Sequence, residues 1–183
     1  MLGAIFSFTA LAVAGREVAD QLDPFELMFY RSLISLAIVS LVLTRSRRGF
    51  GQIRTAHARQ HLYRNLGHFM GQTSWFYAVS VIPFASLVAL EFTNPIWVAI
   101  LAPFLLGEAM TRSRLLAALL GFAGILIVAR PGVAPLEWGH GAGLLAALGF
   151  ALSAIFTRRI MRHDTVLCVL FWMAASQAAM GLL

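Results

Sequence analysis

Residues 65–90 read NLGHFMGQTSWFYAVSVIPFASLVAL, and none of these 26 positions holds Asp, Glu, Lys or Arg. Two further stretches share this property, residues 138–157 and residues 165–183. About 20 apolar residues in a helix cross the hydrocarbon core of a bilayer. The apolar runs are continuous, whereas the strands of a membrane barrel alternate polar and apolar side chains. The pattern therefore predicts an all-α integral membrane protein.

The composition supports the same class. Hydrophobic residues make up 60% of the chain and charged residues 12%, whereas a soluble domain carries about 25% charged residues. We predict about seven transmembrane helices, which cover residues 2–19, 25–44, 63–82, 84–107, 112–130, 140–160 and 165–183.

The placement of the basic residues predicts the topology. All 14 are arginines, and eleven of them lie in or beside the connections that follow the second, fourth and sixth predicted helices. The other connections carry most of the acids, namely Glu17, Asp20, Asp23, Glu26 and Glu137. Because arginine-rich loops stay cytoplasmic, we predict a multi-pass protein of the bacterial-type inner membrane with its N-terminus inside. Topology thus explains the net charge of +6, and nucleic-acid binding is not favoured.

A weak internal repeat is visible. A shift of 142 positions pairs residues 8–12 (FTALA) with residues 150–154 (FALSA), and Arg16 with Arg158. The equivalent loops have opposite charge bias, as an inverted-topology repeat of five helices requires. The second copy would then stop after two helices. Because residues 171–183 hold no charged residue and no polar tail follows them, we expect a truncated chain or fragment, with a natural seven-helix protein as the alternative.

Three segments resemble a known family. Residues 24–33 (PFELMFYRSL) resemble the second-helix signature of the EamA family, in the drug/metabolite transporter superfamily. Residues 84–108, with the sequence NPI at 94–96, are similar to its fourth helix, and residues 121–132 to its fifth helix and exit. The resemblance implies two inverted five-helix repeats, a central cavity and alternating access. Residues 1–132 would form the first repeat and residues 133–183 part of the second.

Glu91 is the first candidate for a functional side chain. It lies about seven residues inside an apolar helix, which is about 10 Å of depth at 1.5 Å per residue. Intramembrane carboxylates usually face a bundle interior or an aqueous cavity. Pro95 cannot donate a hydrogen bond to the Glu91 carbonyl, so we expect a kink. Glu91 is either a substrate or proton site or a packing carboxylate paired with an arginine, and the sequence leaves both open.

The preceding helix supplies a matching polar stripe. Asn65, His68, Gln72 and Trp75 recur at spacings of four and three, which places them on one helix face. A tight turn near Pro83 predicts that the two helices run antiparallel, so that Gln72 is level with Asn94 and Trp75 with Glu91. We therefore expect Gln72, Trp75, Glu91 and Asn94 to border one cavity. For His68 alone an interhelical hydrogen bond is the simpler interpretation, and Trp75 could instead face lipid.

Arg31 lies well inside a predicted span, at nearly the depth of Glu91. A pair between them would lower the cost of burying both charges, and we favour this pair over contact of Arg31 with substrate. Small residues predict packing surfaces: Gly67 with Gly71 on one helix, and Ala117, Gly121 and Gly124 on another.

Motifs for phosphate binding, hydrolysis or metal binding are absent from the sequence, so we predict no enzyme, cofactor or metal. The favoured function is transport of small metabolites or drug-like solutes, with proton coupling left open. A non-transporting fragment or membrane assembly subunit is the alternative, and a membrane enzyme is the third class considered. The expected partners are a small-molecule substrate and the lipid bilayer, with a homodimer left open.

The topology generates a first prediction. Cysteines introduced as Gln52→Cys and Val133→Cys should react oppositely with a membrane-impermeant thiol reagent in intact cells, because they lie in connections of opposite sidedness. Only the second should be labelled from outside. Labelling of Gln52→Cys in intact cells would overturn the topology.

Overall fold

The computed structural model describes residues 10, 13–14, 17, 23–107, 111–129 and 137–182. Within these ranges the chain forms helices and no strand. They are α2 (Pro24–Arg45), the 3₁₀ helix η1 (Gly49–Ile53), α3 (Ala58–Val81), α4 (Phe84–Glu91), α5 (Asn94–Leu106), α6 (Arg112–Ala129), α7 (Trp138–Ile160) and α8 (Val166–Met180). The all-α prediction is confirmed for this part of the chain. The predicted helix at 2–19 falls almost wholly outside it.

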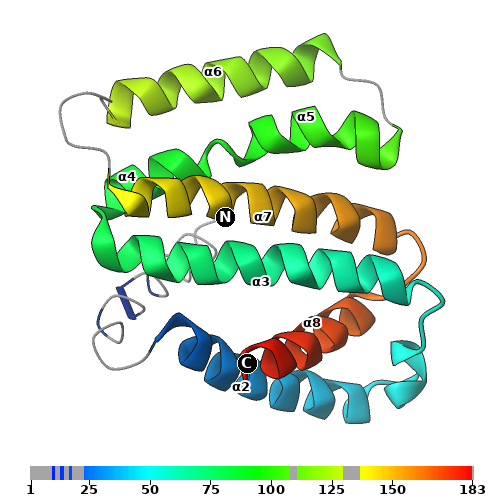
Figure 1. The fold of residues 1–183 in the computed structure, drawn as a ribbon. Helices are drawn as coiled ribbons and strands as arrows, with labels where there is room; N and C mark the ends of the chain where they lie inside the picture. The colour runs from blue at the N-terminus through cyan, green and yellow to red at the C-terminus, as the bar shows by residue number, and fades with distance from the viewer. Residues whose placement is uncertain are drawn as a thin grey trace.

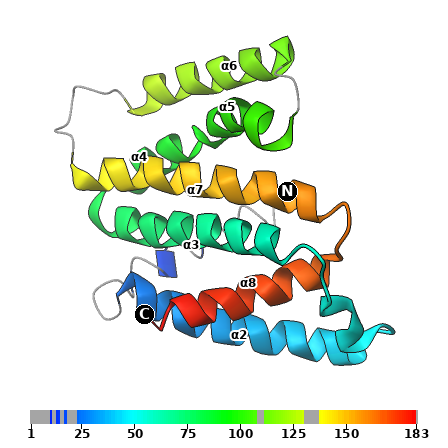
Figure 2. The same ribbon diagram turned by 45° about the vertical axis from the view of Figure 1, so that its right-hand side comes forward.

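The helices are stacked in layers (Figures 1 and 2). α3 and α7 lie side by side in the middle, with α2 and α8 on one side of them and α4 and α5 on the other. α6 lies beyond α4 and α5. Consequently α3 has protein on both sides, and the pair α2–α8 is separated from α4 by the central pair.

Several helix boundaries follow from local capping. Asp23 accepts hydrogen bonds from the backbone N–H groups of Phe25 and Glu26, and Glu26 accepts one from the Asp23 N–H, which forms a capping box. The Thr165 hydroxyl accepts from the Cys168 N–H at the start of α8. α3 begins at Ala58, five residues before the predicted start, since helix formation continues past the apolar stretch.

The predicted helix at 84–107 is two helices rather than one kinked helix. α4 ends at Glu91, and α5 begins at Asn94 with Pro95 in its first turn. Pro95 has no N–H to bond to the Glu91 carbonyl, and the Thr93 hydroxyl donates to the Leu90 carbonyl at 2.6 Å. The predicted kink is thus a break of two residues within the helical stretch Phe84–Leu106. The chain turns at Phe92 and Thr93, next to Glu91.

Glycines allow α3 and α7 to touch through their backbones. A Cβ atom added to Gly149 of α7 would lie 2.6 Å from the Gly67 carbonyl oxygen and 2.6 Å from the Gly71 nitrogen, both on α3. A real Cβ would not tolerate such distances, so the two helices could not approach this closely with larger residues. The predicted packing role of Gly67 and Gly71 is confirmed.

The glycines of α6 behave differently. A Cβ added to Gly121 or Gly124 would meet no atom within 4 Å. The prediction that these two glycines form a packing surface was wrong for the described residues, because both border an open apolar cavity between α4 and α6.

The connections rich in arginine lie at one end of the bundle. Thr55, before α3, donates to Asp164, between α7 and α8, at 2.6 Å. Arg159, near the end of α7, donates to the carbonyl of Leu105, near the end of α5, at 3.4 Å. The connections after α2, α5 and α7 thus share an end (Figure 1), which is the arrangement that the predicted topology requires.

Three helical stretches of the described chain are long and apolar enough to cross a membrane: Phe25–Arg45, Phe84–Leu106 and Trp138–Ile160. α3 does not meet this test despite its 24 residues, because its polar side chains lower its hydropathy. α3 can nevertheless lie at membrane depth, since its polar side chains face neighbouring helices.

The α3–α7 contact generates a stability prediction. Gly149→Ala should lower the free energy of unfolding by about 1–3 kcal/mol, because its Cβ would force the helices apart. Gly141→Ala, in the same helix but with open space around it, should be neutral or stabilise by up to about 1 kcal/mol through helix propensity. Thermal unfolding in detergent measures both. Equal effects of the two substitutions would contradict the backbone contact.

Candidate functional site

α3 carries a continuous buried polar face. His61, Asn65, His68, Gln72 and Trp75 follow one another at spacings of four and three. The exposed fraction is 3% for His61, 2% for Asn65, 5% for Gln72 and 1% for Trp75, and His68 is half-buried. Trp75 therefore does not face lipid. The face runs from the arginine-rich end of the bundle to the level of Glu91.

On one side, this polar stripe of α3 (His61, Asn65, His68, Gln72 and Trp75) contacts α8 through Gln177. The His68 Nδ1 atom lies 2.6 Å from the Gln177 Nε2 atom, and the Gln177 Oε1 atom accepts a hydrogen bond of 3.4 Å from Arg31. Gln177 is only 1% exposed. The interhelical hydrogen bond predicted for His68 is confirmed, and Gln177 joins α2, α3 and α8 at one point.

The predicted Arg31–Glu91 pair is wrong. Arg31 bonds to the neutral side chain of Gln177, and Glu91 accepts from Trp75. The described part of the chain contains no ion pair between Arg31 and Glu91. The cause is the layer order: α2 packs on α8, and α3 and α7 separate it from α4. Two residues at the same depth in the membrane can still be far apart in the membrane plane, as Arg31 and Glu91 are.

On its other side, the stripe contacts the end of α4. The Trp75 Nε1–H donates to the Glu91 Oε2 atom at 3.2 Å. Trp75 and Glu91 are thus at the same level, as the antiparallel register predicted. Glu91 is on the inner face of α4, with Leu87, which is fully buried in the core against α3 and α7.

Asn94 contacts α7 rather than α3. Its Nδ2 atom donates to the Ala147 carbonyl at 3.1 Å. Gln72 is buried one turn before Trp75, next to Gly71, where α3 touches α7. The structure therefore brings Trp75 of α3 to Glu91 of α4 and Asn94 of α5 to α7, and it buries Gln72 on the same face of α3 as Trp75.

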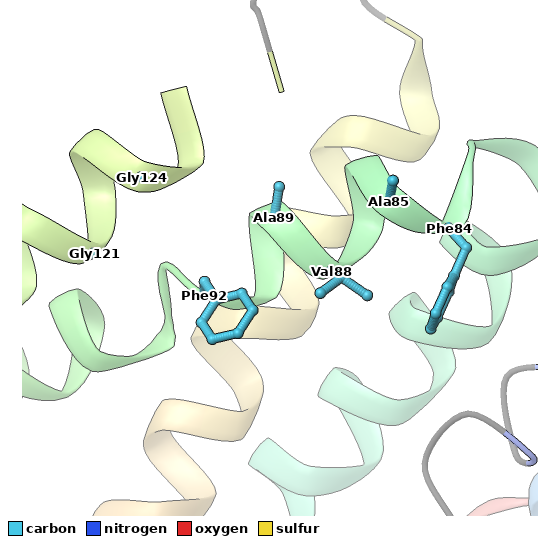
Figure 3. Close-up of a pocket in the computed structure, with 7 residues that line it drawn as sticks. All are labelled: Phe84, Ala85, Val88, Ala89, Phe92, Gly121 and Gly124. Atoms are coloured by element: carbon cyan, nitrogen blue, oxygen red, sulfur yellow. The ribbon is translucent and has the colours of Figure 1, made fainter. Parts of the chain in front are cut away.

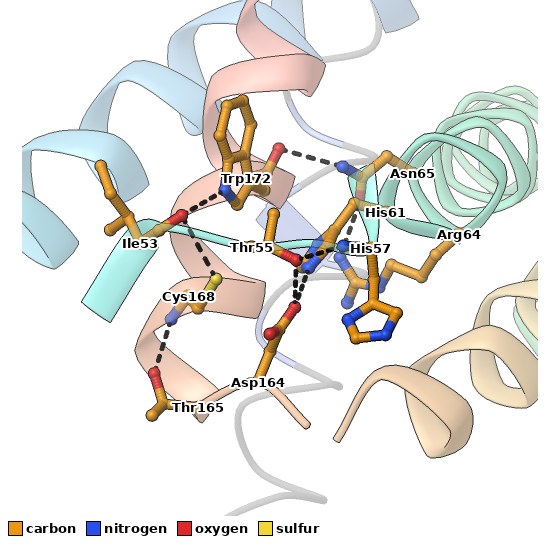
Figure 4. Close-up of polar contacts among 10 residues, drawn as sticks. All are labelled: Ile53, Thr55, His57, His61, Arg64, Asn65, Asp164, Thr165, Cys168 and Trp172. Carbon is orange, nitrogen blue, oxygen red and sulfur yellow. Dashed lines mark hydrogen bonds and ion pairs between the residues drawn. The ribbon is translucent and has the colours of Figure 1, made fainter. Parts of the chain in front are cut away.

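A second polar cluster lies at the arginine-rich end and gave no signal in the linear sequence (Figure 4). The His61 Nε2 atom is 2.8 Å from the Asp164 Oδ2 atom, and Thr55 donates to the same oxygen at 2.6 Å. Burial raises the pKa of Asp164, but the hydrogen bonds from Thr55 and His61 outweigh it and hold that pKa below its usual value. His61 and Asp164 are 103 positions apart in the chain, so no local motif could reveal this pair.

Arg64 and Asn65 extend the second cluster toward α7 and α8. The Arg64 Nε atom donates to the Thr157 hydroxyl at 3.0 Å, and Arg64 Nη1 donates to the Asn65 Oδ1 atom at 2.9 Å. Asn65 Nδ2 then donates to the Trp172 carbonyl at 3.0 Å. The stripe is thus linked by hydrogen bonds to α7 and α8 along its first two turns.

Two open cavities lie on the outside of the bundle and are apolar. One, of about 560 Å³, lies between α4 and α6 and is lined by Phe84, Ala85, Val88, Ala89, Phe92, Gly121 and Gly124 (Figure 3). The other, of about 470 Å³, is lined by Tyr63, Leu66, Gly67, Met70, Leu105, Leu152 and Phe156. Neither includes a predicted site residue. Their walls suit acyl chains or other apolar groups, whereas the stripe offers donors and acceptors.

The polar face of α3 resembles a binding surface more than a reactive centre. Its amides, imidazole and indole can exchange hydrogen bonds with a polar solute, and Arg31 and Glu91 can add charge. A reaction would need a nucleophile aligned with a base, and the described part of the stripe contains no Ser–His or Cys–His pair within hydrogen-bond distance.

The sequence pattern of a family described as the EamA-like transporter family matches residues 1–130. The chain belongs to this family. The family and its named relatives are transporters rather than enzymes, and together with the apolar helices this makes the chain a multi-pass membrane protein.

Named relatives and a solved structure are similar over much of the chain. An S-adenosylmethionine uptake transporter of Rickettsia bellii is 27% identical over 97% of this chain and 60% of its own length. A riboflavin transporter of Brucella anthropi is 30% identical over 72% of this chain and 46% of its own length. A crystal structure with 25% identity matches 98% of this chain and 62% of its own, with a TM-score of 0.62. The chain thus spans about 60% of the length of the S-adenosylmethionine transporter that it matches.

The contact between Trp75 and Glu91 generates a prediction. Trp75→Phe keeps an aromatic ring but removes the indole N–H, so the free energy of unfolding should fall by about 1–3 kcal/mol, as when a buried charged acceptor loses its donor. Trp138→Phe is the matched control, because Trp138 is 88% exposed, and it should change little. Thermal unfolding in detergent compares the two variants. An unchanged unfolding midpoint for Trp75→Phe would show that the hydrogen bond between Trp75 and Glu91 does not stabilise the fold.

Proposed function

We propose that this chain is part of an inner-membrane transporter for small polar metabolites, and that the buried face of α3 lines the solute path. The observation that carries the proposal is the position of this face. Its polar side chains lie between α2 and α8 on one side and α4 and α7 on the other. Polar residues at membrane depth are costly and are typical of substrate and ion pathways.

The two intramembrane charges support a binding role. Arg31 bonds to the neutral Gln177 and Glu91 to the neutral Trp75, so neither charge is neutralised by these partners. The Ser32 hydroxyl, next to Arg31, is 2% exposed and has no hydrogen-bond partner within the described residues. Buried polar groups normally find partners, and a bound solute or water would satisfy this one. Glu91 is the candidate proton carrier if transport is proton-coupled.

The interruption between α4 and α5 also supports a site at this level. Transporters place substrate contacts at broken helices near the bilayer midplane, where backbone groups are free of helical bonds. Here the break at Phe92 and Thr93 lies between Glu91 and Asn94. We therefore propose that Gln72, Trp75, Glu91 and Asn94 contact one solute, with His68 and Arg31 next to Gln177 of α8.

The proposed mechanism is alternating access between two inverted repeats, residues 1–132 and the partial repeat 133–183. The pairing of α2 with α8 supports this division, because these are the second helices of the two proposed copies. α3 packs against α7, so contacts between the copies form the centre of the fold. Movement of one copy against the other would change the surroundings of the α3 face, and the arginine-rich end would be cytoplasmic.

The alternative is a non-transporting fragment or assembly subunit. One observation favours it: the polar side chains of the stripe already bond to neighbouring helices, as a purely structural network would. The two functions differ in ligand dependence. A structural subunit would neither bind nor move a solute, whatever its stability.

The test uses the relatives' substrates as probes. Purified protein reconstituted in liposomes should accumulate radiolabelled S-adenosylmethionine or riboflavin, and Gln72→Leu or Asn94→Leu should reduce the uptake rate about tenfold, the effect of losing about 1.4 kcal/mol of binding. Ser80→Leu is the control, since Ser80 is exposed on the same helix, and it should transport normally.

The outcomes separate the two functions. Uptake by the unaltered chain that is lost in Gln72→Leu, with unchanged membrane insertion, supports the solute path on α3. Uptake that survives both substitutions would move the path elsewhere. Failure to take up either probe would favour the non-transporting alternative.

A further inference from the structure

The corner where α3 begins, α7 ends and α8 begins gathers metal-ligating side chains (Figure 4). His61, Asp164 and Cys168 each offer one ligand atom there, and these atoms all lie within 4.8 Å of one another. Cys168 is the single cysteine of the chain. His57 and His163 stack at 4.7 Å between ring centroids beside the same corner, so three of the chain's five histidines are gathered at this place.

We propose that His61, Asp164 and Cys168 form a site for a divalent transition metal of the Zn²⁺ class. Zinc takes imidazole nitrogen, carboxylate oxygen and thiolate sulfur at about 2.0–2.3 Å in a tetrahedral arrangement. This geometry sets ligand atoms about 3.3–3.8 Å apart. The His61–Asp164 distance of 2.8 Å would widen slightly, and the Cys168 sulfur would rotate inward.

The protonation states balance in this step. The Cys168 thiol loses its proton to solvent and becomes the thiolate ligand. His61 shifts to the tautomer that carries its proton on Nδ1, so that the Nε2 lone pair and the Asp164 carboxylate, now 2.8 Å apart, both face the ion. Two anionic ligands then neutralise the charge of the dication, which matters because arginines surround this end of the bundle.

Two buried ring nitrogens at the same corner leave room in the hydrogen-bond network for bound water. The Nδ1 atoms of His57 and His61 are buried and have no hydrogen-bond partner within the described residues. Buried nitrogen atoms without partners are uncommon and call for a bound water or ion. His57 lies four positions before His61, outside this group of three ligand atoms, so we assign the fourth coordination position to a water molecule.

The ion would act as a clamp. His61 is in the first turn of α3, whereas Cys168 is in the first turn of α8. Their coordination by one ion would hold α8 on α3, where Thr55–Asp164 and Trp172–Ile53 hydrogen bonds already connect the segments. The inference stands independently of the proposed transport function.

The experiment titrates purified protein in detergent with Co²⁺ and then with Zn²⁺. Co²⁺ should give a thiolate-to-metal charge-transfer band and tetrahedral visible bands, which Zn²⁺ then removes. Zn²⁺ at about 100 times its dissociation constant should raise Tm by about 5–10 °C. Cys168→Ser should abolish the charge-transfer band and weaken binding at least tenfold.

A second ligand variant and a control complete the test. Asp164→Asn should also weaken binding at least tenfold, measured on the folded fraction. His140→Ala, at the opposite end of α7, should bind the metal as the unaltered chain does. Absence of the thiolate-to-metal band in the unaltered chain would overturn the metal site. Metal binding that Cys168→Ser leaves unchanged would also overturn it, and the cluster would then only hold the helices together through hydrogen bonds.

Discussion

The backbone contact between α3 and α7 is the constraint on which the other contacts depend. It rests on three glycines, with Gly149 inserted between Gly67 and Gly71. In a bilayer, burial of apolar side chains does little to pull helices together, because lipid is equally apolar, and close van der Waals packing of small residues takes over. With α7 held against α3, the polypeptide that continues from α7 brings α8 to the opposite side, where it meets α2. The layer order follows from this one pair.

The same constraint explains how a helix as polar as α3 can lie at membrane depth. Its histidines, amides and indole would be costly in lipid, but α8 and α4 cover them on two sides. Two of these side chains bond to neighbouring helices instead of water: His68 with Gln177 and Trp75 with Glu91. These bonds are made to neutral or half-buried partners and are few in number.

Charged side chains are arranged differently at the arginine-rich end of the bundle and in its middle. At the arginine-rich end, charged side chains are exposed or hydrogen-bonded, as Asp164 is to Thr55 and His61. In the middle, Arg31 and Glu91 lie in different layers and bond to neutral side chains. Separation by α3 and α7 prevents them from cancelling each other.

The sequence by itself determined the features that are local in the chain. Charge-free stretches such as 65–90 predicted helices, because hydrogen bonds within the helix are the way to satisfy a backbone in lipid. The short turn at Pro83 predicted the antiparallel register and hence the level of Trp75 with Glu91. Pro95 predicted a disturbance of its helix, although not a complete break. The polar stripe of α3 was visible as a spacing of four and three.

Only the tertiary structure decided which helices are neighbours. It paired α3 with α7 and α2 with α8, gave Arg31 the partner Gln177 instead of Glu91, and brought His61 to Asp164 across 103 positions. The physical reason is that helix formation depends on residues a few positions apart, whereas lateral packing depends on how two distant surfaces fit. Depth in the membrane follows from counting residues along one helix. The direction in which a helix face points, and the helix that it packs against, depend on how closely two backbones approach at positions such as Gly149. The pattern of residues along the sequence does not show this approach.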